Sequence, residues 1–327
     1  MTITRRSFLA GSASCSLLAL ARPARAAETV KMGDLPTLSS AGLYVAIDKG
    51  YFTEKNLAVE TEKFASGAKM IAPLATGQLD VATGSPSAGL FNSIAAGADF
   101  KIVADKGQVR PGHSFNQITV RKDLIDSGRV KTVKDLKGMK IATGAKGIIL
   151  DYFMAKMLES EGLTYDQVEM VALAYPDAVK ALGTKAVDAL IAPEPWGVRA
   201  EQQKLGVRAF PTEQFPAIAS FQVGVIMYSG KFIKERPKVA RDFMQAYAKG
   251  VRHYNERGPK NDEIAAILAK HTQVPAETTK AAYPFYADPT IKPRVQDLAT
   301  MQDFFAKMGW VKNPVPMDRV VDLSFLE

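Results

Sequence analysis

Cysteine, histidine and tryptophan are scarce in this sequence. Its 327 residues include one cysteine, Cys15, three histidines and two tryptophans. The histidines, His113, His253 and His271, lie far apart, without the short spacings of zinc sites. Folded chains of about 300 residues bury roughly three quarters of the surface exposed on unfolding, so their cores need neither disulfides nor metals. We therefore expect no thiol chemistry, no metal and no cofactor.

A hydrophobic run long enough to cross a membrane is also lacking near the N-terminus. The apolar segment Phe8–Ala21 has fourteen residues, whereas a membrane helix needs about 20. Arg5-Arg6 precedes this segment, and Ala24-Arg25-Ala26 supplies a small-residue cleavage site. This order is typical of a twin-arginine export signal. We predict a signal peptide over residues 1–26, cleaved near its end, and a periplasmic mature protein.

The predicted mature chain has only a small excess of positive charge. The whole sequence carries a net charge of +8, and residues 1–26 contain four arginines and no acids, so the remainder carries +4. Its lysines alternate with acids, as in Lys134-Asp135 and Lys234-Glu235, without a basic stripe interleaved with aromatics. We therefore expect no nucleic-acid partner.

Short β-rich runs alternate with segments of helical periodicity. This alternation is typical of an α/β fold, in which helices flank the sheets. The first series predicts strands at 30–32, 57–64, 80–82 and 101–104, with helices at 41–47, 68–76 and 87–96. A second series predicts strands at 140–143 and 168–173 around a helix at 148–161.

An internal echo suggests that the two series are copies of one α/β domain. Leu74–Ala82 resembles Leu182–Leu190 at a constant offset of 108 residues. This period is too long for the unit of a solenoid. The order of strand, loop, helix and strand before each segment recurs at nearly the same offset. We therefore favour a duplicated domain over a chance echo.

Two extended stretches, Asn116–Arg121 and Ala219–Tyr228, are candidates for crossings between the copies. The chain would leave the first domain at one crossing and return to it at the other. This path assigns residues 27–118 and 222–327 to lobe 1 and residues 119–221 to lobe 2.

Glycine, serine, threonine and proline gather in loops that end predicted strands and lead into helices. In open α/β sheets, such loops bind small ligands, and helix N-termini favour a small anion or a polar head group. Motifs for nucleophilic catalysis or nucleotide binding are absent, so the loops favour a binding protein over an enzyme. The loops are residues 36–40, 66–68, 84–87, 143–147 and 192–196.

Six segments carry a pattern that is specific in its order and spacing: Gly42–Phe52, Leu57–Glu60, Leu74–Asp80, Val133–Ala142, Val187–Ala189 and Glu194–Trp196. They resemble the nitrate, sulfonate and thiamine-pyrimidine branch of ABC-transporter substrate-binding proteins. The resemblance implies the two-lobed type II periplasmic-binding fold, in which two crossing strands join mixed sheets flanked by helices. It also implies a monomer that closes by a hinge on a small solute. The loaded form would dock on an inner-membrane permease driven by a cytoplasmic ATPase.

The resemblance implies ligand contacts from both lobes. For Tyr44 and Trp196 two readings stay open: their rings sandwich a flat ligand, or they pack inside the protein. The implied contact residues are Thr37, Leu38, Ser39, Tyr44, Gly67, Gly84, Ser85, Ser87, Asn116, Thr143, Gly144, Ala145, Glu194, Trp196 and Gln222.

The identity of the ligand stays open between several classes. Helix N-termini favour a sulfonate or nitrate, for which Lys146 is a candidate counter-charge. Glu194 favours a ligand with N–H donors, such as an aminopyrimidine or a taurine-like aminosulfonate, unless it caps a helix. Two other functions are alternatives: a periplasmic partner of a sensory membrane protein and, less favoured without a cysteine cluster, an enzyme resembling those of thiamine-pyrimidine synthesis.

Overall fold

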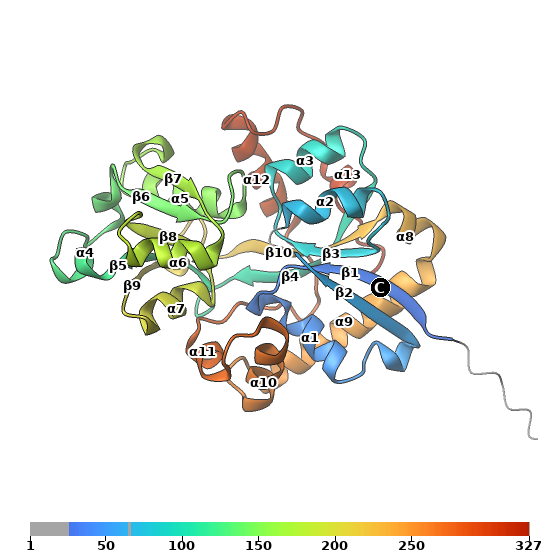
Figure 1. Cartoon of the computed structure of the whole chain (residues 1–327). Coiled ribbons are helices and arrows are strands. Elements are labelled where there is room, and N and C mark those ends of the chain that lie inside the picture. Colours follow the sequence, from blue (N-terminus) through green and yellow to red (C-terminus); the bar gives the residue numbers. More distant parts are fainter. Residues whose placement is uncertain (1–25, 65–66, 327) are drawn as a thin grey trace, which may run out of the picture.

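A computed structural model describes residues 26–64 and 67–326 as two lobes lying side by side (Figure 1). Residues 1–25, which hold almost all of the predicted export signal, lie outside the described residues, as does Ser66 of one predicted loop. Within the described ranges, no helix has both the length and the apolar character needed to cross a membrane.

Each lobe is built on a five-stranded mixed sheet. In spatial order, the first sheet contains β2 (Leu57–Lys63), β1 (Glu28–Asp34), β3 (Val81–Gly84), β10 (Phe221–Ser229) and β4 (Phe100–Val109). The second contains β7 (Glu169–Ala172), β6 (Lys140–Thr143), β8 (Ala189–Pro193), β5 (Asn116–Arg121) and β9 (Gly206–Pro211). The prediction of an α/β fold with two mixed sheets is therefore confirmed.

The chain passes between the lobes twice, once between β4 and β5 and once between β9 and β10 (Figure 1). β5 pairs along its whole length with β8 and β9 of the second sheet. β10 pairs with β3 and β4 of the first. The crossings themselves thus lie just before the two extended stretches singled out in the sequence.

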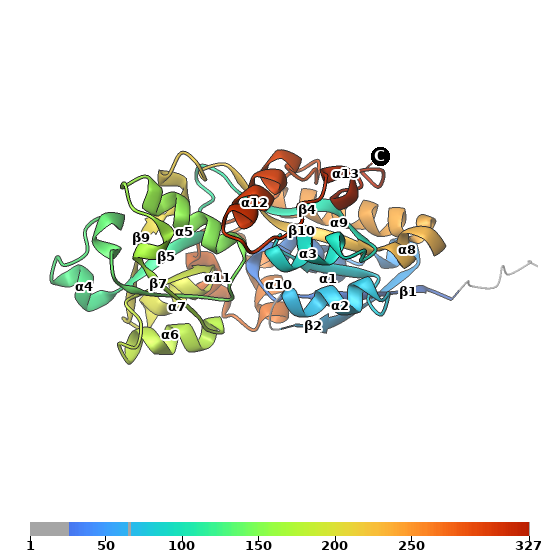
Figure 2. The ribbon, with the colours of Figure 1, turned by 90° about the horizontal axis from the view of Figure 1, so that it is seen from above.

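Helices cover both faces of each sheet. In Figure 1, α1, α9 and α10 lie on one side of the first sheet and α2 and α3 on the other. In Figure 2, α5 covers one face of the second sheet, and α6 and α7 cover the opposite face. The helices are α1 (Ala41–Asp48), α2 (Ala68–Ala75), α3 (Ala88–Ala95), α4 (Lys122–Asp126), α5 (Ile149–Glu159), α6 (Tyr175–Gly183), α7 (Trp196–Gln202), α8 (Gly230–Glu235), α9 (Pro237–Arg257), α10 (Asp262–Thr272), α11 (Ala276–Ala281), α12 (Val295–Lys307) and α13 (Met317–Val320).

Two glycines let α1 approach α9 closely. A Cβ atom at Gly250 would lie 2.1 Å from the carbonyl oxygen of Gly42, and a Cβ atom at Gly42 would lie 2.6 Å from a methyl group of Val251. Only glycine fits this crossing without moving one helix. The packing holds α1, and with it the loop that enters α1, at the edge of the first sheet.

The internal echo corresponds to equivalent positions in the two sheets. Asp80 accepts a hydrogen bond from the amide of Lys31 at 2.9 Å and pairs with Arg236 at 3.2 Å. Asp188 accepts from the amide of Lys140 at 3.0 Å and pairs with Arg121 at 3.0 Å. Each aspartate directly precedes its sheet's third parallel strand and ties it to the first, at Lys31 within β1 and at Lys140 at the start of β6. Both sheets also share one strand order, which supports the duplication inferred from the sequence.

We expect Asp188→Ala to lower the free energy of unfolding by about 2 kcal/mol, because it removes two hydrogen bonds to a charged acceptor. Urea denaturation followed by circular dichroism measures this change. Asp126→Ala is the matched control, since Asp126 forms an exposed pair with Lys122 whose loss costs less than about 0.5 kcal/mol. Equal effects of the two substitutions would contradict the structural role given to Asp188.

Candidate functional site

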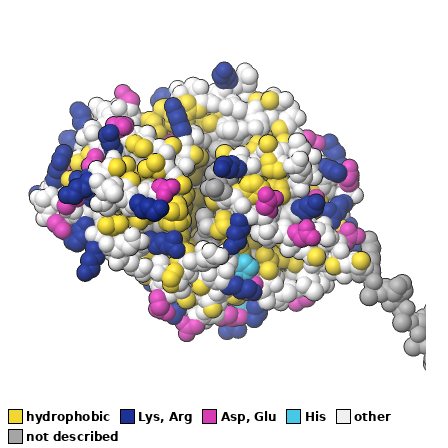
Figure 3. All heavy atoms as spheres, in the orientation of Figure 1, with side chains coloured by type: hydrophobic (Ala, Val, Ile, Leu, Met, Phe, Trp, Pro, Cys, Tyr) yellow, Lys and Arg dark blue, Asp and Glu magenta, His cyan; other side chains and the backbone are white. Residues whose placement is uncertain are grey.

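A cleft lies between the lobes, where loops from both sheets face one another. Its empty volume, including the open mouth, is about 880 Å³. Figure 3 shows the hollow with apolar atoms along its walls and Lys and Arg side chains around its mouth. The geometry is that of a binding site to which both lobes contribute.

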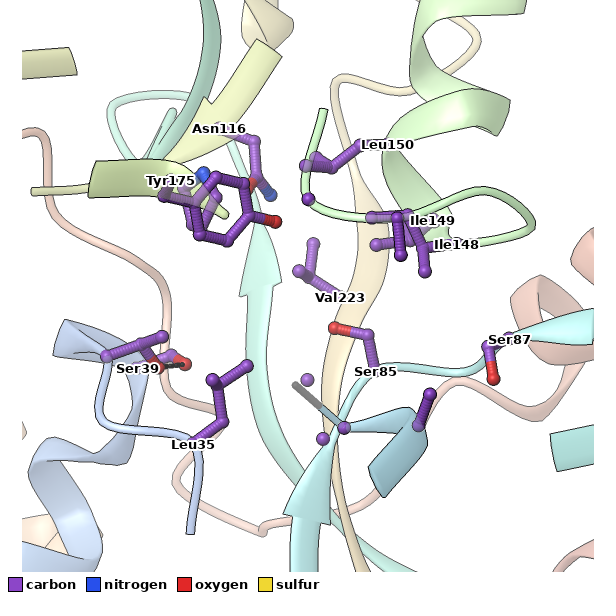
Figure 4. A pocket seen from close by; sticks show the side chains of 18 of the residues that line it. Leu35, Ser39, Ser85, Ser87, Asn116, Ile148, Ile149, Leu150, Tyr175 and Val223 are labelled. Carbon is purple, nitrogen blue, oxygen red and sulfur yellow. Dashed lines mark hydrogen bonds between the residues drawn. The ribbon is translucent and has the colours of Figure 1, made fainter. Parts of the chain in front are cut away.

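Nine residues implied by the resemblance line this cleft. They lie in the loops that follow the parallel strands, with Asn116 at the start of β5, and Figure 4 shows Ser39, Ser85, Ser87 and Asn116 among them. Ser87 also accepts a hydrogen bond from the amide of Leu90 and so caps α3. The nine are Thr37, Ser39, Gly67, Gly84, Ser85, Ser87, Asn116, Gly144 and Ala145.

Besides Glu194 and Trp196, four implied residues lie outside the cleft lining. Tyr44 is 1% exposed, and its hydroxyl donates to Asp34 while its ring stacks on His271 at 4.4 Å. Gln222 is buried and donates to Asp105 at 2.6 Å. The remaining two are Thr143, which is buried beside the cleft loop, and Leu38, which borders a smaller separate cavity.

Glu194 is fully buried in an ion pair away from the cleft lining. Its carboxylate accepts from the Arg208 guanidinium at 2.6 Å, from the Val198 amide at 3.1 Å and from the Tyr283 amide at 3.3 Å. Burial raises the pKa of Glu194, and the Arg208 charge partly opposes this rise. Glu194 therefore caps α7 and joins the second lobe to the C-terminal segment.

Trp196 stands behind the cleft wall rather than in it. Its ring stacks on Tyr175 at 6.1 Å between centroids, and the Arg199 guanidinium lies 4.9 Å from its centre. Tyr175 itself lines the cleft, and its hydroxyl points into the cavity (Figure 4). The aromatic ring that lines the cleft here is thus that of Tyr175, and Trp196 packs against it.

The lysine in the cleft is Lys106, whereas Lys146 is exposed and lies over the Trp310 ring at 5.4 Å. Lys106 is 3% exposed and donates to the Ser40 hydroxyl at 3.2 Å. Burial lowers the pKa of Lys106, and the nearby Asp34 carboxylate opposes this change. The sequence offered little signal for Lys106, because Asp105–Gln108 is a polar run that the prediction placed beyond the strand.

Two irregularities in the pairing of β4 with β10 bring Lys106 and Val223 to the cleft. Gln222 faces Gln108, Gly224 faces Gly107 and Val225 faces Asp105. Val223 is therefore an extra residue on β10, and Lys106 is an extra residue on β4. Such bulges re-aim side chains next to binding sites. Both bulged residues line the cavity.

Most of the lining that the sequence did not indicate is apolar. Ile148, Ile149 and Leu150 enter from the start of α5, and Val223 lies opposite them in Figure 4. Their hydrophobicity resembles that of core residues, so periodicity alone gives no reason to place them in a site. The remaining lining residues are Leu35, Ala68, Lys106, Phe115, Ala174, Tyr175, Pro193 and Gly224.

The lobes touch directly at one side of the cleft. The amide of Ala88 donates to the carbonyl oxygen of Gly147 at 2.8 Å. The buried Asp151 carboxylate fixes the second partner, because it accepts from the amides of Gly147 and Ile148 and from the Tyr165 hydroxyl. This contact brings the start of α3 against the start of α5.

Gly144→Ala should weaken solute binding about tenfold or more while the fold stays intact. A Cβ atom at position 144 would lie 2.5 Å from the Tyr175 hydroxyl oxygen, so the Tyr175 ring must move. Isothermal titration measures the affinity. Gly89→Ala is the control, because position 89 is exposed on α3 and its added Cβ would meet only the Ser87 hydroxyl at 3.8 Å. Unchanged affinity in Gly144→Ala would rule out Tyr175 as part of the site.

Glu194→Ala should lower the free energy of unfolding by about 3 kcal/mol, because it leaves a largely buried arginine without its nearest partner. Solute affinity should change less than threefold in the variant that still folds. Chemical denaturation and titration measure the two quantities, with Glu169→Ala, which breaks an exposed 3.5 Å pair, as the control. A selective loss of binding to amine-bearing solutes would instead place Glu194 in contact with ligand.

Comparison with known proteins gives a family and a fold. Residues 37–257 match the family described as NMT1/THI5 like. No curated protein matches the chain. Many solved structures share its fold.

Three of these structures illustrate the likeness. The alkanesulfonate-binding protein SsuA from Xanthomonas axonopodis pv. citri, bound to MOPS, has a TM-score of 0.73 and 18% identity over 91% of this chain and 100% of its own. The periplasmic nitrate-binding protein NrtA from Synechocystis PCC 6803 has a TM-score of 0.69 and 17% identity over 90% and 84%. The desulfurization enzyme DSZB has a TM-score of 0.65 and 15% identity over 91% and 97%.

Binding proteins and an enzyme thus share this architecture, because one fold can carry sites of unrelated function. The likeness to these structures concerns the fold, whereas the family match covers more than half of the sequence. The chain belongs to the NMT1/THI5-like family and has the two-lobed fold of periplasmic binding proteins.

Proposed function

We propose that this protein captures a small solute in the cleft between its lobes and delivers it to an ABC permease with a cytoplasmic ATPase. The observation that carries the proposal is the cleft itself. Both lobes line it, and its lining combines polar hydrogen-bonding groups with apolar side chains. In this proposal the protein is exported through its twin-arginine signal, acts in the periplasm as a monomer, and closes by moving lobe 2 (119–221) against lobe 1 (27–118 and 222–327).

The lining supports binding over catalysis. Among the described residues that line the cleft there is no His, Cys, Asp or Glu, so the serine and threonine hydroxyls of the lining have no general base of these types beside them in it. Lys106 and Tyr175 are the titratable side chains of the lining. Burial raises the pKa of Tyr175 further above neutral pH and lowers the pKa of Lys106. This supports a solute-binding protein over an enzyme like its desulfurising relative in fold.

The candidate solutes are those raised by the sequence: a sulfonate or taurine-like compound, a nitrate-like anion, or an aminopyrimidine. SsuA and NrtA, which share the fold, are named as binders of alkanesulfonates and nitrate. A periplasmic partner of a sensory membrane protein would use the same cleft. Loss of solute uptake in cells that lack this protein would favour transport over sensing.

A thermal-shift screen of the purified protein tests this function. We expect one of taurine, alkanesulfonates, nitrate, aminopyrimidines or aromatic carboxylates to raise the melting temperature by several degrees. A solute at 100 times its dissociation constant adds about 2.7 kcal/mol of stability. Small-angle scattering with and without the solute then measures lobe closure. A screen in which no small solute shifts the melting temperature would contradict the proposal.

A further inference from the structure

We propose that the solute is an organic monoanion with an apolar body, and that Lys106 binds its anionic group. This inference rests on the proposed function and narrows it to one class of solute. The anionic group is a carboxylate or a sulfonate, two groups that present the same charge and similar acceptor oxygens to an ammonium.

Lys106 is held in the cleft, and its ammonium has more N–H donors than the hydrogen bonds that the structure gives it. Its ammonium carries three N–H donors, and the hydrogen bond that the structure gives it is the one to Ser40 at 3.2 Å. Gly224 leaves room for its side chain, because a Cβ atom there would lie 3.2 Å from both the Cβ and the Cε of Lys106. The bulge and this glycine together aim a buried cation into the cavity.

Asp34, the carboxylate whose charge acts on Lys106, is held by hydrogen bonds from groups other than Lys106. Its Oδ1 accepts from the hydroxyls of Ser40 at 2.9 Å and Thr83 at 2.8 Å, and its Oδ2 accepts from Tyr44. The Ser40 hydroxyl therefore stands between the carboxylate and the ammonium. Three hydroxyls donate to Asp34, whereas Lys106 donates to one hydroxyl. An anion in the cleft would offset the cost of burying the Lys106 cation.

An unpaired donor on β5 of the second sheet independently indicates a ligand with acceptor atoms. Asn116 lines the cleft and is 1% exposed, and its Nδ2 has no hydrogen-bond partner among the described residues. A buried amide without a partner is costly. Tyr175 lies beside Asn116 in Figure 4, across the cavity from Ser39. We assign to Asn116 a hydrogen bond to an oxygen of the bound solute.

The lining disfavours bare inorganic anions and aminopyrimidines. Ile148, Ile149, Leu150 and Val223 give a bare nitrate or sulfate no partner for most of the cavity surface. An aminopyrimidine with N–H donors would meet Lys106, a second donor, in a lining whose described side chains include no carboxylate. An anionic head joined to an apolar body satisfies both the lysine and the walls.

Titration calorimetry with matched probes tests the inference on the wild-type protein first. Hexanoate and hexanesulfonate carry the charge and the apolar body, hexanamide keeps the body without the charge, and nitrate keeps the charge without the body. We expect the two organic anions to bind at least thirtyfold more tightly than hexanamide or nitrate. This comparison needs no variant and so does not depend on how a substitution affects folding.

Lys106→Met then assigns the charge recognition to one residue. We expect affinity for hexanoate and hexanesulfonate to fall about 100-fold and affinity for hexanamide to change less than threefold. Lys146→Met is the matched control, because it removes an exposed cation near the same loops and should alter every affinity less than threefold. Circular dichroism checks that each variant is folded.

The possible outcomes distinguish a failure of this inference from a failure of the proposed solute-binding function. Equal binding of hexanoate and hexanamide, or full retention of anion affinity in folded Lys106→Met, would overturn the role of Lys106. Binding of nitrate or an aminopyrimidine without any organic anion would overturn the solute class but leave a solute-binding protein. Only a failure of every small solute to bind would overturn the proposed function as well.

Discussion

The pairing of β4 with β10 is the constraint on which the rest of the structure depends. These strands flank the two crossings, and a buried carboxylate holds them together. Asp105 accepts from Gln222 at 2.6 Å, from the Gly107 amide at 3.0 Å and from the Asp288 amide at 3.2 Å. Burial raises the pKa of Asp105 to about 7. Because these bonds fix the register, they also fix the bulges that turn Lys106 and Val223 toward the cleft.

Contacts between the lobes lie on more than one side of the paired strands β4 and β10. The Ala88 amide meets the Gly147 carbonyl oxygen at the front of the cleft. The Arg208 guanidinium of the second sheet bonds both Glu194 and the carbonyl oxygen of Ala281 in the C-terminal segment. Among the described residues, Gln108, Asn116, Gln117, Thr143 and His253 have buried side-chain atoms without a hydrogen-bond partner, and Asn116 is the one of them that lines the cleft.

The two lobes use one architecture but contribute differently to the cleft. Asp80 and Asp188 occupy equivalent places and the strand orders match, so the scaffolds are alike. The first sheet and its loops offer hydroxyls and the buried lysine, whereas the second sheet and its helices offer the apolar start of α5 with Asn116 and Tyr175. Duplication thus explains the frame of the site, and local sequence in each copy explains its chemistry.

The sequence by itself determined the alternation of strands and helices, the repeated Asp80 and Asp188 segments, and the loops that reach the cleft. Each of these follows from local periodicity, from glycine and serine at helix starts, or from a short echo. Eight of the nine implied contact residues that line the cleft lie where parallel strands end, and such strand ends meet at one edge of a sheet; the ninth, Asn116, begins the antiparallel strand β5.

Only the tertiary structure decided which polar residues face the cleft and which hold the protein together. Gln222 and Asp105 meet across 117 residues of sequence, and the register of their strands places Lys106 in the cavity. Glu194 is directed to Arg208, and Trp196 is covered by Tyr175, through packing between elements far apart in the chain. Local patterns carry no information on such pairings, because a shift of one residue in a strand turns each side chain to the opposite face.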